Sequence, residues 1–197
     1  MTAGRTIKSQ SVRWCTPPKY VDAVVRVLGS PIALDPCSDK LSIVPAETAY
    51  LLPQANGLRK SWDFRTIYVN PPYGVDRKRG SSIRDWLRRC RDAHTEHAAE
   101  VLALVPVAAN TRHWKESVWG QAAAVCFLYD TRLRFLEEGK AQAKGAPMAC
   151  AMIYWGENVD RFVDVFTEFG AAIDIRDLQG KALGDCESGL PKVFCQA

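Results

Sequence analysis

The sequence predicts an α/β domain with a mainly parallel, twisted sheet covered by helices on both faces. Short apolar runs typical of buried strands alternate with segments whose apolar residues recur every three or four positions, the spacing of an amphipathic helix. No internal repeat and no long linker rich in Pro, Gly or Ser interrupts this alternation. We therefore expect the 197 residues to form a single domain over 1–197.

The first expected helix, at 18–28, has the clearest boundaries. Pro17 and Pro18 suit a first helical turn, apolar residues follow with helical spacing, and Gly29 is typical of a helix end. The same reasoning predicts helices at 81–98, 110–119 and 160–169. The expected strands are 32–35, 67–70, 101–105, 122–129, 147–155 and 171–175.

Composition excludes several classes of protein. With 47% hydrophobic and 24% charged residues, the chain is neither disordered nor fibrous. Its longest apolar runs are far below the ~18 residues of a membrane span, and no secretory signal is visible, so we expect a cytoplasmic protein without a membrane partner. None of the seven cysteines forms a C-x-x-C pair, so we expect reduced thiols and no metal site.

The segment Asn70-Pro71-Pro72-Tyr73, followed by Gly74, comes directly after an expected strand. Two prolines fix the backbone and remove amide donors, which leaves carbonyl oxygens as acceptors. Asn70 adds a side-chain acceptor and Tyr73 a flat aromatic face. Two acceptors beside a ring fit a planar amine, although a simple turn at the end of the strand is the other interpretation.

Two more segments are expected beside this one. Asp35-Pro36-Cys37 ends another expected strand, and Trp14 to Thr16 precede the helix before it. Ligands of open α/β sheets bind outside the carboxyl ends of strands, so Asp35 and Asn70 are predicted to share one crevice. Asp35 would hold a cationic group there, with Trp14 and Thr16 folded over the site.

Basic residues concentrate next to the proline motif. The stretch 77–91 contains seven basic residues and a single acid. We interpret its first three, Arg77, Lys78 and Arg79, as phosphate contacts at the mouth of the crevice, with Arg84 and Arg88 as further candidates. Arg89 and Arg91 are interpreted as part of a solvated helix face. The polar connection 130–146 is the second candidate for DNA contact. Its basic residues are Arg132, Arg134, Lys140 and Lys144.

Taken together, these segments resemble the phage-type DNA adenine methyltransferase (Dam) family over most of the chain. The blocks that carry the resemblance are W-C-T-P at 14–17, L-D-P-C at 34–37, N-G-L-R-K-S-W at 56–62, N-P-P-Y-G at 70–74, L-V-P at 104–106, T-R-H-W at 111–114 and R-L-R-F at 132–135. The sequence departs from the family at Asn56, where an acid is usual. It also lacks a glycine-rich loop after the first strand, an absence that the resemblance to the family tolerates.

The resemblance implies a Rossmann-like methyltransferase domain that binds S-adenosylmethionine and DNA, in the cytoplasm of a bacterial or phage-infected cell. The cofactor residues it implies are Trp14, Thr16, Asp35, Pro36, Glu47 and Asp63, with Asp39 as an alternative to Glu47 for the ribose.

The catalytic residues it implies are those of the proline motif. Adenine within a duplex is unreachable, so the target base is flipped out or taken from a single strand. Tyr73 would stack on this base, with Pro72 completing the motif. Asn70 and the Pro71 carbonyl would accept hydrogen bonds from its N6 amine, which would then attack the methyl group in line.

Two other functions remain open at this point. The same motif suits another planar amine, in RNA, protein glutamine or cytosine. The missing glycine-rich loop also fits an inactive methyltransferase-like domain that binds nucleic acid. Methylation of RNA or protein in place of DNA would favour the first, and failure to bind S-adenosylmethionine would favour the second.

Overall fold

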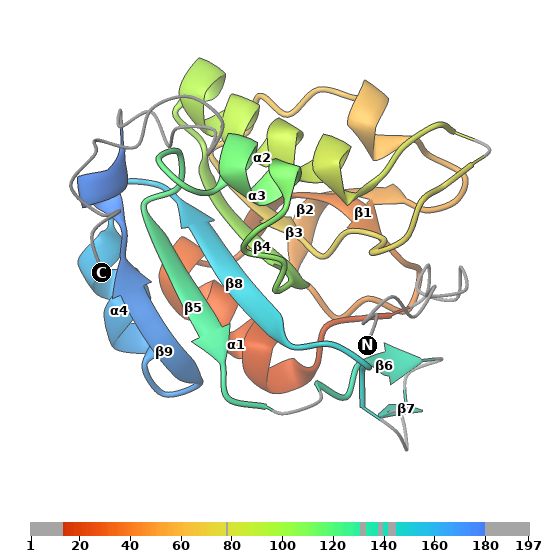
Figure 1. The fold of residues 1–197 in the computed structure, drawn as a ribbon. Coiled ribbons are helices and arrows are strands. Elements are labelled where there is room, and N and C mark those ends of the chain that lie inside the picture. The colour runs from red at the N-terminus through yellow and green to blue at the C-terminus, as the bar shows by residue number, and fades with distance from the viewer. Residues whose placement is uncertain (1–13, 78, 131–132, 138–139, 142–144, 180–197) are drawn as a thin grey trace, which may run out of the picture.

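The computed structural model describes residues 14–77, 79–130, 133–137, 140–141 and 145–179. Figure 1 shows a twisted central sheet with helices on both sides. The helices are α1 (Pro18–Leu28), α2 (Ile83–His97), α3 (Arg112–Ser117) and α4 (Val159–Phe166). The strands are β1 (Ile32–Ser38), β2 (Ala46–Leu51), β3 (Thr66–Val69), β4 (Glu100–Pro106), β5 (Ala124–Leu128), β6 (Leu136–Glu137), β7 (Lys140–Ala141), β8 (Cys150–Trp155) and β9 (Gly170–Asp174).

The main sheet of the described residues has the strand order β2-β1-β3-β4-β8-β5-β9. β2, β1, β3 and β4 are parallel, β8 lies antiparallel between β4 and β5, and β9 pairs antiparallel with β5. β2 lies on one side of β1 and β3 on the other, so the chain changes direction across the sheet at β1. The carboxyl ends of β1 and β3 therefore flank a topological switch point, where open α/β sheets bind ligands.

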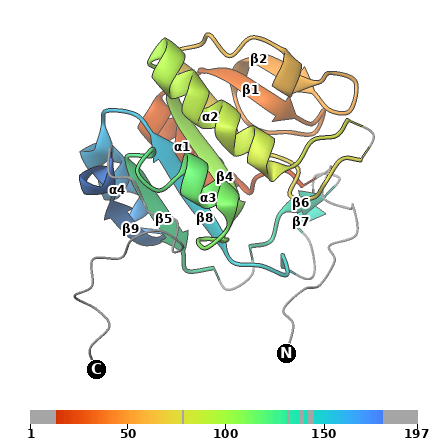
Figure 2. The ribbon, with the colours of Figure 1, turned by 45° about the horizontal axis from the view of Figure 1, so that its top comes forward.

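Both faces of the sheet are covered (Figure 2), and each has its own apolar core. Along β4, Leu102 and Leu104 pack with α1 and α4, whereas Val101, Ala103 and Val105 pack with α2 and α3. This is the alternation of a strand buried on both sides, and it explains the continuous apolar sequence. The structure thus confirms the predicted α/β class and the helices on both faces.

The expected elements differ from the observed ones mainly at their ends. The helix predicted at 18–28 is found with those bounds, whereas α2, α3 and α4 are shorter than predicted. β2 was not predicted, because an edge strand with alternately exposed residues has no continuous apolar run. In the described part of the chain, no helix is long and apolar enough to cross a membrane.

Candidate active site

A pocket opens at the carboxyl ends of β1 and β3, at the switch point. The N-terminal segment 14–16, the end of β1, the loop after it and the N-P-P-Y segment all contribute to its wall. The lining residues are Trp14, Cys15, Thr16, Asp35, Cys37, Ser38, Asp39, Ser42, Val44, Leu52, Tyr68, Asn70 and Pro72. The structure therefore brings the predicted Trp14, Thr16, Asp35, Asn70 and Pro72 together in one site.

Asn70 is at the centre of a hydrogen-bond network in this wall. Its side-chain nitrogen donates to the Trp14 carbonyl oxygen at 2.7 Å and to the Thr16 hydroxyl at 3.2 Å. The Thr16 hydroxyl in turn lies 2.7 Å from the hydroxyl of Tyr68. Asn70 accepts at its side-chain oxygen from the Tyr73 hydroxyl at 3.2 Å. These contacts tie the N-terminal segment to β3 and to the proline motif.

Tyr73 is more enclosed than a freely accessible stacking platform. Its side chain is 9% exposed, and its hydroxyl also lies 3.2 Å from the Leu104 carbonyl oxygen. The ring packs edge-on against Trp14 and Phe135, with centroids 6.1 and 5.8 Å away. Burial raises the pKa of the Tyr73 phenol well above its usual value, so the group is neutral.

Asp35 supplies the buried negative charge of the pocket. It is 4% exposed and accepts a hydrogen bond from the Cys37 backbone N–H at 3.1 Å. Burial raises the pKa of its carboxyl to about 6, against the lowering effect of hydrogen bonds from Ser38 and Cys37. A carboxylate that burial disfavours gains most from a cationic ligand. A buried carboxylate at this position fits the positively charged part of S-adenosylmethionine.

Comparison with protein families assigns the chain. The model of the DNA N-6-adenine-methyltransferase (Dam) family matches residues 3–172. The chain belongs to this family. It is thus an adenine-specific DNA methyltransferase, and S-adenosylmethionine is the general methyl donor of the family. A comparison with curated proteins finds no match.

Two acids predicted for the Dam cofactor lie elsewhere in the structure. Glu47 is exposed near the start of the edge strand β2. Asp63 is 77% exposed, precedes β3, and has its carboxylate 3.8 Å from His97 at the end of α2. The structure brings neither to the pocket. Asp39, the alternative to Glu47, does line it.

Pro36 supports the site through its backbone. A Cβ at Gly57 would clash with the Pro36 carbonyl oxygen, so only glycine allows the N-G-L block to pack against the D-P-C segment. The Gly57 carbonyl also accepts from the Trp62 indole at 2.9 Å. Two of the blocks that resemble the Dam family are thus in direct backbone contact.

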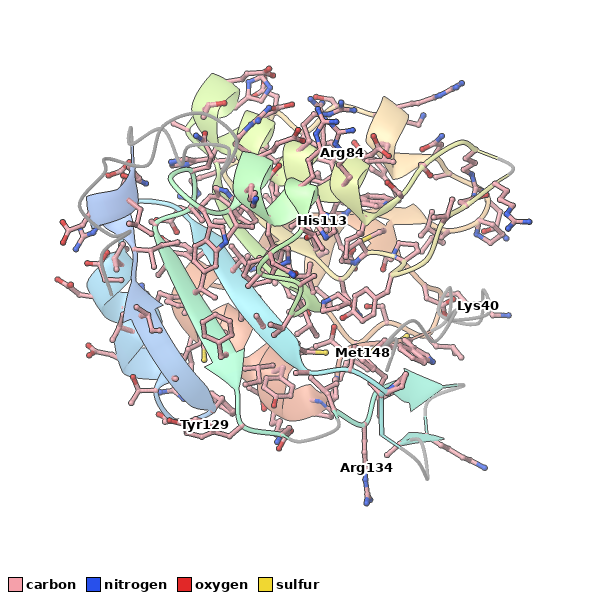
Figure 3. All side chains as sticks on the ribbon, in the orientation of Figure 1. Lys40, Arg84, His113, Tyr129, Arg134 and Met148 are labelled. Atoms are coloured by element: carbon pink, nitrogen blue, oxygen red, sulfur yellow. The ribbon has the colours of Figure 1, made fainter. Side chains whose placement is uncertain are left out.

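The residues predicted to contact DNA differ in their exposure and in their partners within the protein. Arg77 is exposed, whereas Arg79 pairs with Asp76 at 2.6 Å and donates to the Pro53 carbonyl. Arg134 and Lys140 are exposed, and Figure 3 shows the Arg134 side chain extending away from the protein. Lys78, Arg132 and Lys144 lie outside the described residues.

The arginines along α2 pair with acids of the protein. Arg84 contacts Glu116 at 3.0 Å, and Arg88 contacts Asp85 at the same distance. Arg91 contacts Asp92 at 2.6 Å. These three guanidinium groups thus contact carboxylates of the protein itself.

Sequence reasoning missed Tyr68, Phe135 and Leu136 as part of the site. Trp14 stacks on Phe135, with ring centroids 5.0 Å apart and planes 13° from parallel. Cys15 and Leu136 exchange two backbone hydrogen bonds, both of 2.9 Å. Phe135 belongs to the R-L-R-F block, so the sequence marked its position without indicating a role.

Proposed function

We propose that this Dam-family enzyme transfers a methyl group from S-adenosylmethionine to the N6 amine of an adenine that has been flipped out of DNA. One observation carries the proposal: a buried acid, Asp35, and a polar amide, Asn70, line the same pocket at the carboxyl ends of adjacent strands. The acid suits a cationic methyl donor and the amide suits a planar amine.

In this proposal Asp35 faces the positive charge of the cofactor, and Asp39 replaces Glu47 as the acid for the ribose hydroxyls. Trp14, Thr16 and Pro36 complete the cofactor side of the pocket. S-adenosylmethionine supplies an electrophilic methyl group when bound.

Asn70 and the Pro71 carbonyl accept the two N–H groups of the target amine. These two hydrogen bonds localise the lone pair on the amine nitrogen. The nitrogen then attacks the methyl carbon in line with the carbon–sulfur bond. A nitrogen–carbon bond forms as the carbon–sulfur bond breaks, and the amine then releases one proton. Tyr73 and Pro72 support the flipped base. The chemistry needs positioning and electrostatics, without a covalent enzyme intermediate.

DNA approaches across the exposed cations at the same edge. We assign phosphate contacts to Arg77, Arg134 and Lys140, and assign the polar connection 130–146 to the recognition of bases. Arg79 holds the loop after the proline motif through Asp76 and Pro53 and adds charge beside the phosphates.

Methyl transfer from labelled S-adenosylmethionine to unmethylated duplex DNA tests the proposal, with nucleoside analysis of the product. We expect N6-methyladenine from the wild type, and a loss of about 100- to 1,000-fold in turnover for Asn70→Ala, as for other lost hydrogen-bond partners at a reacting atom. Asn158→Ala is the matched control, since Asn158 caps α4 away from the pocket. Methylation of cytosine, RNA or protein alone, or no cofactor binding, would contradict the proposal.

A further inference from the structure

The orientation of the Asn70 side chain decides whether it can serve the reaction. A carboxamide has nearly the same shape when turned by 180°, but only its oxygen can accept a hydrogen bond from an amine. An Asn70 turned the other way would present its own N–H groups to the target nitrogen. The protein therefore has to fix the orientation of this amide.

The backbone carbonyl of Trp14 fixes the orientation of the Asn70 amide. This oxygen can only accept, and it lies 2.7 Å from the Asn70 side-chain nitrogen. Turning the amide would place two oxygens at that distance, with no proton between them. The Thr16 hydroxyl takes the second N–H of Asn70 at 3.2 Å, so both donors of the amide are used by the protein. The Asn70 oxygen accepts from the Tyr73 hydroxyl at 3.2 Å and keeps its second acceptor position for the target amine.

Thr16 is itself held in place from inside the protein. It is 2% exposed, and its hydroxyl is 2.7 Å from that of the buried Tyr68. A hydroxyl has one donor and two acceptor positions, so Thr16 can bond to Tyr68 and still accept from Asn70. Tyr68 lies in β3 and Asn70 directly follows that strand. The contact between Thr16 and Tyr68 therefore holds the Asn70 amide in a fixed position relative to the sheet.

The segment that carries the Trp14 carbonyl is held by Phe135 and by Leu136, the first residue of β6. The Trp14 ring stacks on Phe135, which is fully buried, and the Cys15 backbone pairs with Leu136 on both sides. The same short stretch carries the exposed Arg134, which we assign to DNA. The stretch 134–136 is therefore connected to Asn70 through the Trp14–Cys15 segment.

We infer that Thr16 and Phe135 are positioning residues for methyl transfer: they hold the Trp14–Thr16 segment so that Asn70 presents its oxygen, and not its nitrogen, to the target amine. For its kinetic consequences the inference rests on the proposed function. It assigns Thr16 a role beyond lining the cofactor pocket, and Phe135 a role that no motif indicated.

The kinetic test separates this role from cofactor binding. Thr16→Val keeps the shape and removes the hydroxyl, and we expect turnover at saturating DNA and cofactor to fall by about 10- to 100-fold. Thr16 lines the cofactor side of the pocket, but its hydroxyl bonds to Tyr68 and Asn70, so its removal should change the dissociation constant of S-adenosylmethionine by less than about threefold. Thr16→Ser should restore most of the turnover. Thr167→Val, on the exposed end of α4, is the matched control. A loss confined to cofactor affinity would overturn the inference.

A second readout does not depend on activity. In 15N-labelled protein, the two side-chain N–H signals of Asn70 can be identified by their disappearance in Asn70→Asp. Thr16→Val should shift one signal upfield and speed its exchange with solvent, and Phe135→Ala should affect both. Phe162→Ala removes an equally buried ring from the same core, where it stacks on Tyr154 and Phe166, and should affect neither signal.

The two readouts distinguish the possible failures. Unchanged Asn70 signals in both Thr16→Val and Phe135→Ala would overturn the positioning role, whatever the wild type methylates. If the signals change as expected but the wild type methylates no adenine, the positioning of the amide stands and the proposed function fails.

Discussion

The hydroxyl groups of Tyr68 and Thr16 meet at 2.7 Å inside the protein, although 52 residues separate them in the sequence. Tyr68 points to the face of the sheet that packs against α1, the helix that begins just after Thr16. Burial raises the pKa of the Tyr68 phenol far above its usual value, and the nearby Asp35 adds to this effect. The phenol therefore stays protonated and acts only as a hydrogen-bond partner.

Tyr68→Phe should lower the free energy of unfolding by about 1–2 kcal/mol, because the Thr16 hydroxyl loses its buried partner. Urea unfolding of wild type and variant measures the difference. Tyr129→Phe makes the same chemical change at a side chain that is 72% exposed, and should leave stability unchanged. Equal stability of Tyr68→Phe and the wild type would show that the two hydroxyls contribute no net stabilisation.

The sequence predicted the layers of this fold because each buried strand and covering helix has its own local pattern. β3 and β4 are apolar on both faces, and α1 has clear signals at both ends. No local pattern predicts the antiparallel direction of β8, because that direction depends on which strands lie beside it. An antiparallel strand buried on both faces has the same apolar run as a parallel one.

Some residues of the site could likewise be placed from the sequence, whereas others could not. Asp35 and Asn70 could be placed together because both follow strands whose carboxyl ends lie at one edge. Asp63 could not be placed in this way, since it precedes a strand and the loop containing it leads to the opposite edge. Phe135 and Tyr68 are apolar or aromatic core residues by pattern, and only their contacts with Trp14 and Thr16 indicate a role.

Asp35 should make the stability of the ligand-free enzyme depend on pH. Burial raises its pKa from 3.8 in the unfolded chain to about 6, so its ionised form destabilises the fold. The neutral Asp35 carboxyl therefore contributes to the free energy of unfolding below pH 4, and this contribution is lost as the pH rises through 6. Asp35→Asn should therefore be more stable than the wild type at pH 8, by up to about 3 kcal/mol, and nearly equal to it at pH 4.

Urea unfolding at both pH values measures this change, and cofactor titration provides the functional counterpart. A cationic ligand favours ionised Asp35, so wild-type affinity for S-adenosylmethionine should fall about tenfold per pH unit below 6. Asp35→Asn should bind weakly with little dependence on pH. Parallel pH profiles for wild type and variant would remove Asp35 from the cofactor site.

Gly57→Ala should disturb the fold next to the pocket. The new Cβ would clash with the Pro36 carbonyl oxygen, a backbone atom that can move only with β1. We expect a loss of about 1–3 kcal/mol in the free energy of unfolding, as for other overpacked sites. Gly74→Ala is the matched control, since its Cβ would meet no atom within 4 Å. Similar unfolding curves for the two variants would show that the Gly57 contact relaxes without cost.

Arg77 and Arg79 should differ in how they affect the salt dependence of DNA binding. Each phosphate contact contributes about 0.9 to the slope of log affinity against log salt concentration. Arg77 is exposed, so Arg77→Gln should reduce the slope by about that amount without changing stability. Arg79 is paired with Asp76 and bonded to Pro53, so Arg79→Gln should change the slope less and lower the stability of the loop.

Binding titrations between 50 and 200 mM salt, roughly the range over which such contacts show their effect, measure both slopes. If Arg79→Gln reduced the slope as much as Arg77→Gln, its guanidinium would have to leave Asp76 for the phosphates when DNA binds.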